Sequence, residues 1–203
     1  MAPVTRRLSI TVIALVMVAF AAGITLESSA LASGSLPITK VKTPGKTIRY
    51  GMLAPNMEPT IHCGPSDAPT DGCLGAQRDT MVIRAPLQTV KRFDIVSSKI
   101  THRMAGSCGP RASFIQRVIA LPGETWSERN GYVYIDGKKL SEPYLGPLVR
   151  DHLSYKPRTL RADEYFLMGD NRAESCDSRR FGPLHFADMP ARVVRIERPT
   201  FPR

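Results

Sequence analysis

Short β-type runs separated by turn signals recur from Thr47 onward, and they constrain the fold of this chain more than any other feature. The runs are rich in Val, Ile, Phe and Tyr, which favour extended backbone, and they lie at 80–83, 93–96, 113–121, 132–135, 164–168 and 192–196. Asn130-Gly131 and Asp136-Gly137 flank the fourth run, and both dipeptides are typical of tight hairpin turns. No helical periodicity of useful length accompanies the runs. We therefore predict a mostly β domain of antiparallel sheets over residues 47–203.

An apolar segment at residues 8–26 precedes this region and contains no charged side chain. As a helix it would span ~28 Å, about the hydrocarbon thickness of a bilayer. Arg6 and Arg7 stand before it and Glu27 after it, so the positive-inside rule places the N-terminus in the cytoplasm. We predict a single-pass protein of the cell membrane, with a cytoplasmic tail at 1–7, one N-terminal transmembrane helix and an extracytoplasmic domain.

Residues 27–46 are rich in Ser, Gly, Thr and Pro and are predicted to form a juxtamembrane linker. A cleavable signal peptide is the alternative interpretation of the N-terminal region. In that case Ala30-Leu31-Ala32, followed by Ser33, would be the small-residue cleavage site. Under both interpretations the rest of the chain is exported.

All 4 cysteines lie in the exported part: Cys63, Cys73, Cys108 and Cys176. An even number in an oxidising compartment indicates two disulfides, for which three pairings exist. Cys63 and Cys73 bracket a short loop rich in Gly, Pro and Asp, which favours the local pair and leaves Cys108 with Cys176. Histidines stand near Cys63 and Cys108, but no tight His/Cys spacing supports a metal site, and we predict none.

The formal net charge is +10, and arginine far outnumbers lysine. An exported domain without a nucleic-acid-binding motif is a poor candidate for binding nucleic acid. Attraction to anionic lipid headgroups is one explanation of this charge, and a solvated basic surface is the other.

Three segments in fixed order carry a family resemblance: Met57-Glu58-Pro59-Thr60, Arg117-Val118-Ile119-Ala120-Leu121-Pro122-Gly123-Glu124, and Met168-Gly169-Asp170-Asn171-Arg172-Ala173-Glu174-Ser175-Cys176-Asp177-Ser178-Arg179. Behind an N-terminal anchor, they resemble the type I signal peptidases, membrane serine peptidases that use a Ser/Lys pair to remove signal peptides. The resemblance covers residues 50–182 and implies a β domain at the membrane surface without a cofactor. Residues 91–96 resemble a further strand of the family, which usually has glycine in place of Phe93.

The resemblance places three catalytic positions on substituted residues. The nucleophilic serine corresponds to Asn56, the general-base lysine to Gln116, and a serine that donates to the oxyanion hole in many members to Ala54. An asparagine amide has no hydroxyl to deprotonate, and a glutamine amide cannot take up a proton at neutral pH. Neither Arg117 nor Thr60 is a convincing replacement, because Arg117 stays protonated and Thr60 stands at a structural position.

The third segment, by contrast, matches the family closely. The resemblance implies that Ser175 hydrogen-bonds the catalytic amine and that Asp177 and Arg179 brace the site. Asp170 belongs to the same turn-rich loop, whose carboxylates and guanidinium groups are expected to pair. With Gln116 in place of the lysine, we expect Ser175 to hydrogen-bond the amide instead. The alternative is a purely structural loop.

The resemblance also implies a peptide-binding cleft, in which an extended substrate adds as a strand between residues near 49–55 and 113–116. Such binding needs the backbone rather than catalytic side chains. Met52, Leu53 and Ile115 are candidates for the shallow pockets that would select small residues, and a role in the core is the alternative.

Three functions follow as hypotheses. The first is an active signal peptidase, cutting after Ala-x-Ala sites with an unrecognised nucleophile. The second is an inactive homologue that binds the signal peptides of exported precursors. The third is a structural domain or one that docks an active paralogue. The two substituted positions favour loss of activity.

Overall fold

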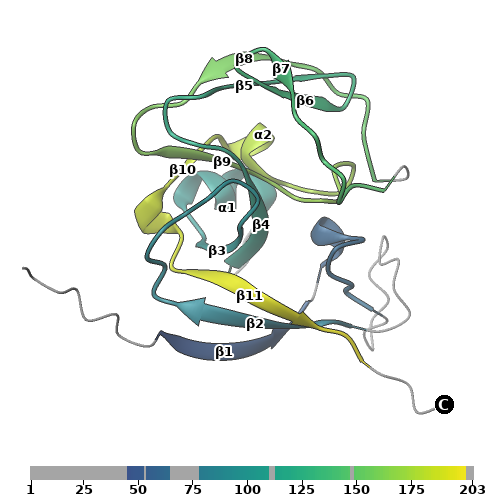
Figure 1. Ribbon diagram of the computed structural model, residues 1–203, viewed down its shortest axis with the longest axis vertical. Helices are drawn as coiled ribbons and strands as arrows, with labels where there is room; N and C mark the ends of the chain where they lie inside the picture. The colour runs from purple at the N-terminus through teal and green to yellow at the C-terminus, as the bar shows by residue number, and fades with distance from the viewer. Residues whose placement is uncertain (1–44, 53, 65–77, 110–112, 147–148, 200–203) are drawn as a thin grey trace, which may run out of the picture. The chain divides into compact units, whose positions relative to one another are not determined.

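The computed structural model describes residues 45–52, 54–64, 78–109, 113–146 and 149–199, and their main element is a seven-stranded sheet (Figure 1). In their order across the sheet, the strands are β1 (Lys46–Gly51), β2 (Thr80–Ala85), β11 (Ala191–Glu197), β3 (Ile95–Lys99), β4 (Ser113–Ala120), β9 (Glu164–Met168) and β10 (Leu184–His185). All neighbouring strands pair antiparallel. The predicted mostly β, antiparallel domain is therefore confirmed.

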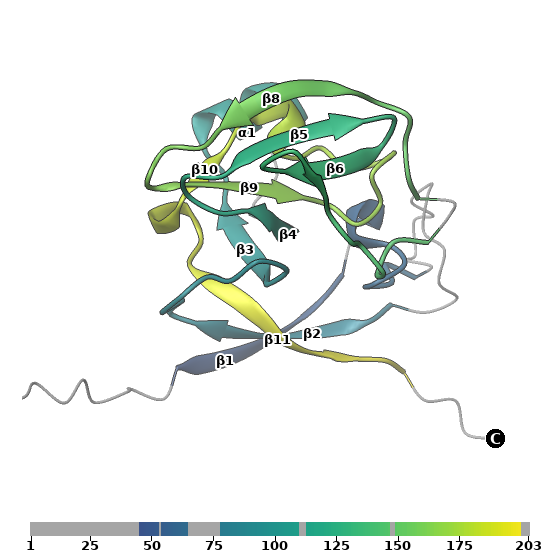
Figure 2. The same ribbon diagram turned by 45° about the horizontal axis from the view of Figure 1, so that its top comes forward.

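A smaller sheet contains β7 (Lys138–Lys139), β6 (Tyr132–Ile135), β5 (Thr125–Arg129) and β8 (Tyr155–Thr159), in that order. The two predicted turn dipeptides join its first three strands in sequence. All four of their residues have positive φ, from 47° at Asn130 to 77° at Gly137, which is the backbone that mirror-image hairpin turns require. The small sheet and the β1–β2–β11 end lie on opposite sides of β3 and β4 (Figures 1 and 2).

Three apolar clusters form the core. One lies between β3, β4, β9 and the helices and includes Val96, Val118 and Leu167. A second joins the two sheets, where Trp126 stacks on Phe166 with ring centroids 4.0 Å apart. The third packs β2 and β11 against the turn that contains Met57.

Four short helical segments complete the described residues: α1 (His102–Cys108), α2 (Ser178–Phe181), and the 3₁₀ turns η2 (Pro55–Met57) and η3 (Phe186–Asp188). Neither α-helix was predicted, because both are too short to show a period. Both have side-chain N-caps: the Thr101 hydroxyl accepts from the Met104 N–H, and the Asp177 carboxylate accepts from the Arg179 N–H.

The predicted Cys108–Cys176 disulfide is present and ties the end of α1 to the loop before α2. Cys63 is buried after the first motif, but Cys73 lies outside the described residues, and the Cys63–Cys73 pairing stays a prediction. The predicted tail, anchor and most of the linker also lie outside the described residues, although β1 already begins at Lys46. Among the helices that the structure describes, none is long and apolar enough to cross a membrane.

Candidate active site

The first motif begins at the last residue of η2; Met57 and Glu58 are buried, and Pro59 and Thr60 are half-buried. Met57 has no exposed surface and packs into the third apolar cluster. The buried Glu58 carboxylate accepts the Cys63 N–H at 3.0 Å and lies 2.6 Å from Nδ1 of His62. Thr60 points its hydroxyl at Asp170 of the third motif, with an Oγ1–Oδ2 distance of 2.5 Å. The motif thus fixes the chain directly after Asn56 by contacts on several sides.

Asn56 joins the first motif to β4 and to the third motif. Its side-chain Nδ2 donates to the main-chain carbonyl of Ile115 at 2.7 Å. Its own carbonyl accepts the Asn171 N–H at 3.1 Å. Gly169 passes so close that a Cβ there would collide with the Asn56 carbonyl and with the Ser175 hydroxyl. The position of Asn56 is therefore fixed at its backbone and at its side chain.

Gln116 is fully buried, and its Nε2 donates to the Cys176 carbonyl at 2.8 Å. The expected hydrogen bond between Ser175 and Gln116 is not formed. Within the described residues, Oε1 of Gln116 and Oγ of Ser175 are both buried without a hydrogen-bond partner. The amide donor meets a main-chain carbonyl next to Ser175, and this contact takes the place of the predicted one.

Arg117 lies beside Gln116 but contacts a different set of groups. Its Nε and Nη2 bind the two Asp170 oxygens at 2.9 and 2.6 Å, a bidentate pair that is almost fully buried. The guanidinium also donates to the Phe93 carbonyl at 3.0 Å and lies 4.0 Å from the Tyr144 ring centroid. Strand β4, the first motif and the third motif are therefore joined at one ion pair.

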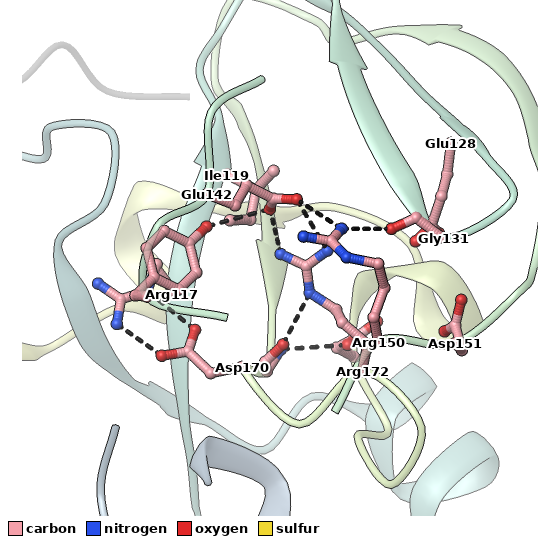
Figure 3. A network of polar contacts seen from close by, with 12 residues as sticks. Arg117, Ile119, Glu128, Gly131, Glu142, Arg150, Asp151, Asp170 and Arg172 are labelled. Atoms are coloured by element: carbon pink, nitrogen blue, oxygen red, sulfur yellow. Dashed lines mark hydrogen bonds and ion pairs between the residues drawn. The ribbon is translucent and has the colours of Figure 1, made fainter. Parts of the chain in front are cut away.

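A second buried network holds the third motif from the side of the small sheet (Figure 3). The Glu142 carboxylate pairs with Arg172, receives Arg150 at 3.3 Å and accepts the Tyr144 hydroxyl at 3.1 Å. Arg172 also donates to the Gly169 carbonyl at 3.0 Å. Burial, reinforced by the Glu142 carboxylate, raises the pKa of Tyr144 above its ordinary value, so Tyr144 stays a neutral donor.

Asp177 and Arg179 brace the end of the third motif. The Asp177 carboxylate accepts the Gly169 N–H at 3.1 Å, as well as Nε and Nη2 of Arg179 at 2.8 and 2.9 Å. Arg179 also donates from Nη1 to the Asp151 carboxylate at 2.5 Å and from Nη2 to the Arg172 carbonyl at 2.7 Å. These contacts hold the backbone of the third motif in place, and the supporting role of Asp177 and Arg179 in a catalytic site stays a prediction.

Behind Arg179 lies Glu128 of β5, a carboxylate with no exposed surface. Its nearest cation is Nη1 of Arg179, 3.8 Å away, and neither of its oxygens has a hydrogen-bond partner among the described residues. Burial raises the pKa of the Glu128 carboxyl to about 7, and Arg179 opposes this shift only partly. No sequence pattern predicted this group.

The three residues predicted to contact the substrate, Met52, Leu53 and Ile115, differ in their surroundings. Met52 is only 4% exposed and belongs to the third apolar cluster, which favours the alternative role in the core. Ile115 is half-buried against the same cluster, and Leu53 lies outside the described residues. Ala54 immediately precedes η2, and its methyl group supplies no hydrogen-bond donor.

Sequence reasoning missed the residues that support the third motif from the 142–151 segment, namely Glu142, Tyr144, Arg150 and Asp151. They follow no period and no motif, and the pairs that reach the third motif, Glu142 with Arg172 and Asp151 with Arg179, join residues 30 and 28 positions apart. The only available signal was the number of arginines in the third motif, since each buried guanidinium requires an acceptor.

The antiparallel β domain, with three motifs meeting at the edge of β4, defines the class of signal-peptidase-like domains. In agreement, the sequence profile of the family described as "Signal peptidase, peptidase S26" matches residues 4–196. The chain therefore belongs to the signal peptidase S26 family.

Several curated relatives are similar to this chain. Signal peptidase I V of Bacillus subtilis (strain 168) is 38% identical over 110 residues, covering 48% of this chain and 60% of that protein. Signal peptidase I of Bacillus amyloliquefaciens is 41% identical over 81 residues, covering 35% and 43%. Signal peptidase I of Bacillus caldolyticus is 32% identical over 117 residues, covering 51% and 59%. The matches thus span no more than 60% of the length of these relatives.

A crystal structure of a signal peptidase I from Enterococcus faecalis V583 is also similar. It is 27% identical in sequence, with a TM-score of 0.43, and the match covers 53% of this chain and 99% of that one.

Proposed function

We propose that this chain is a signal peptidase homologue that binds the signal peptides of exported precursors without cutting them. The observation that carries the proposal is the chemistry of the side chains at positions 56 and 116. Where the family resemblance expects a hydroxyl nucleophile and an amine base, two neutral amides stand, and each donates to a main-chain carbonyl: Asn56 to Ile115 and Gln116 to Cys176. Neither amide can attack a carbonyl or accept its proton.

The hydroxyls near this position offer no substitute within the described residues. Thr60 donates to Asp170, whose two oxygens already receive Arg117. Ser175 is buried and has no base beside it. Nucleophilic catalysis needs a base within hydrogen-bond reach of the nucleophile. Removing nucleophile or base from a comparable serine protease costs about 10⁶ in turnover, so we expect no detectable hydrolysis.

The surroundings of position 116 would still suit the missing amine base. Position 116 is fully buried, and burial lowers the pKa of a lysine placed there. The Ser175 hydroxyl has no hydrogen-bond partner among the described residues and could accept a bond from that amine. These observations support the idea that the chemistry is missing while the scaffold remains.

The test compares the purified full-length chain with the double variant Asn56→Ser/Gln116→Lys on a model preprotein that has an Ala-x-Ala site. We expect no cleavage by the native chain, and measurable cleavage by the double variant that increases with pH as the lysine loses its proton. Each single variant is the matched control and stays inactive, because each lacks one of the two groups. Native cleavage after Ala-x-Ala would refute the loss of activity, and lack of saturable binding of a signal peptide would refute the binding role.

A further inference from the structure

Strand β4 has a free edge at Ile115. On the β3 side, Val118 donates its N–H to Asp94 at 2.9 Å, and its carbonyl accepts the Phe93 N–H at 2.8 Å. Backbone groups alternate between the two edges of a strand, so those of Arg117 and Ile115 point away from β3. Arg117 pairs there with Met168 of β9, and no described strand pairs with Ile115 on that side.

The Ile115 carbonyl at this edge is already occupied. Nδ2 of Asn56 donates to it at 2.7 Å, and Asn56 is held in place through its own carbonyl by the Asn171 N–H. A peptide that adds to an antiparallel edge places its main-chain N–H groups where such carbonyls point. The side-chain amide of Asn56 therefore stands where the N–H of an added peptide strand would stand.

We infer that Asn56 competes with the bound peptide for the free edge of β4, and that it lowers the affinity of the cleft for extended peptides. This inference rests on the proposed peptide-binding function. A peptide either displaces the Asn56 amide or binds without a hydrogen bond to the Ile115 carbonyl. In both cases the free energy of peptide binding lacks the contribution of one backbone hydrogen bond.

The size of the effect follows from the value of one hydrogen bond. A net contribution of ~0.5–1.5 kcal/mol corresponds to about 2- to 12-fold in Kd. Truncating Asn56 removes the competitor and leaves the Ile115 carbonyl free, so we expect tighter binding by this factor. The opposite change is expected if the amide contacts the peptide favourably.

The experiment measures the Kd of a fluorescent synthetic signal peptide, with an apolar stretch and an Ala-x-Ala end, for the full-length chain in detergent micelles. The variants are Asn56→Ala and the nearly isosteric Asn56→Asp, which retains the size of the side chain but cannot donate. Asn130→Gly, in a turn of the small sheet where φ is positive, is the matched control that should leave the Kd unchanged.

A second series of peptides, each N-methylated at one backbone position of the extended segment, identifies the bond that changes. In the Asn56→Ala variant one position becomes sensitive to methylation, because its N–H now binds the Ile115 carbonyl. In the native chain methylation at that position has a smaller effect or none.

Each outcome decides a point. Tighter binding by both Asn56 variants, with the new methylation-sensitive position, supports the competition. Equal binding by native chain and variants, or weaker binding by the variants, overturns the competition and leaves the proposed function standing. Absence of binding by all forms refutes the proposed function itself. Binding by the variants alone supports the competition and refutes peptide binding by the native chain.

Discussion

At the scale of single residues, the buried Glu128 carboxylate makes the stability of the domain depend on pH. Its carboxylate is buried on β5 and has one guanidinium at 3.8 Å and no hydrogen bond from a described group. Asp151 and Asp177 also act on it and favour its neutral form, while Arg179 and Arg172 favour the charged form. Because burial outweighs the guanidinium groups, the carboxyl keeps its proton to about pH 7 in the folded chain.

The pKa of Glu128 predicts a pH-dependent stability. The pKa of about 7 in the folded chain lies above the ordinary value of 4.5, so the folded state binds more protons between these two pH values. The contribution of Glu128 to stability is therefore full below pH 4.5, falls as the pH rises to about 7 and is constant above it. The loss is of the order of 3 kcal/mol. We expect E128Q to be more stable than the native chain at pH 8 and similar to it at pH 5, as measured by urea unfolding.

The control is Glu174→Gln, which changes an exposed carboxylate in the same region of the chain. Its difference in unfolding free energy from the native chain should not vary between pH 5 and pH 8. A difference between E128Q and the native chain that is equally constant would show that Glu128 titrates at its ordinary pKa.

The residue scale also shows where the sequence was informative and where it was not. Phe93 stands where the family usually has glycine, and its φ of 71° explains that preference, since this backbone is costly for a side chain. The prediction that positions 56 and 116 are substituted catalytic positions came from the motifs alone. Their hydrogen-bond partners were not predicted, because both acceptors are main-chain carbonyls, which any residue type supplies.

At the scale of elements, the link between α1 and the third motif is covalent. The Cys108–Cys176 disulfide closes a separation of 68 residues, and the carbonyl of Cys176 receives the Gln116 amide. The loop before α2 is thereby attached to a helix on one side and to β4 on the other. The pairing was predictable because the other two cysteines bracket a short loop, whereas α1 itself was not.

Removing this disulfide is expected to destabilise the domain. A bridge across such a separation restricts the unfolded chain, and its loss typically costs roughly 2–4 kcal/mol. We expect Cys108→Ser/Cys176→Ser to lower the unfolding free energy by that amount in urea titrations under oxidising conditions. The native chain measured with reductant gives the combined effect of losing this bridge and the predicted Cys63–Cys73 bridge. An unchanged unfolding free energy would show that the bridge does not constrain the domain.

Most of the strands could be predicted from the sequence at the element scale, because a short apolar run between turn residues has few alternatives. Thus Tyr132–Ile135 was predicted with its observed bounds, and Glu164–Met168 likewise. The order of strands in the sheet could not be predicted. The position of β11 between β2 and β3 joins segments about 100 residues apart, and nothing local in the sequence specifies such a pairing.

For the whole molecule, the arrangement of charge and apolar residues along the chain predicts its place in the cell. The described domain belongs to a compact unit that begins at Thr43, and the uncharged segment 8–26 precedes it behind two arginines. A domain with a disulfide and a single uncharged segment before it fits export with retention at the membrane. If the same segment were a cleaved signal peptide, the domain would be released from the membrane.

Topology is tested by expressing the full chain in bacteria and adding protease to intact spheroplasts. We expect digestion of the domain without lysis, because the arginines before residue 8 hold the N-terminus in the cytoplasm. The intact mass should correspond to the 22.4 kDa chain, and alkaline carbonate should leave it in the membrane fraction. A protein shortened to begin near Ser33 and released by carbonate would establish the cleaved alternative. Protection of the domain until lysis would place it in the cytoplasm, where it could not meet exported precursors and where its disulfide would be reduced.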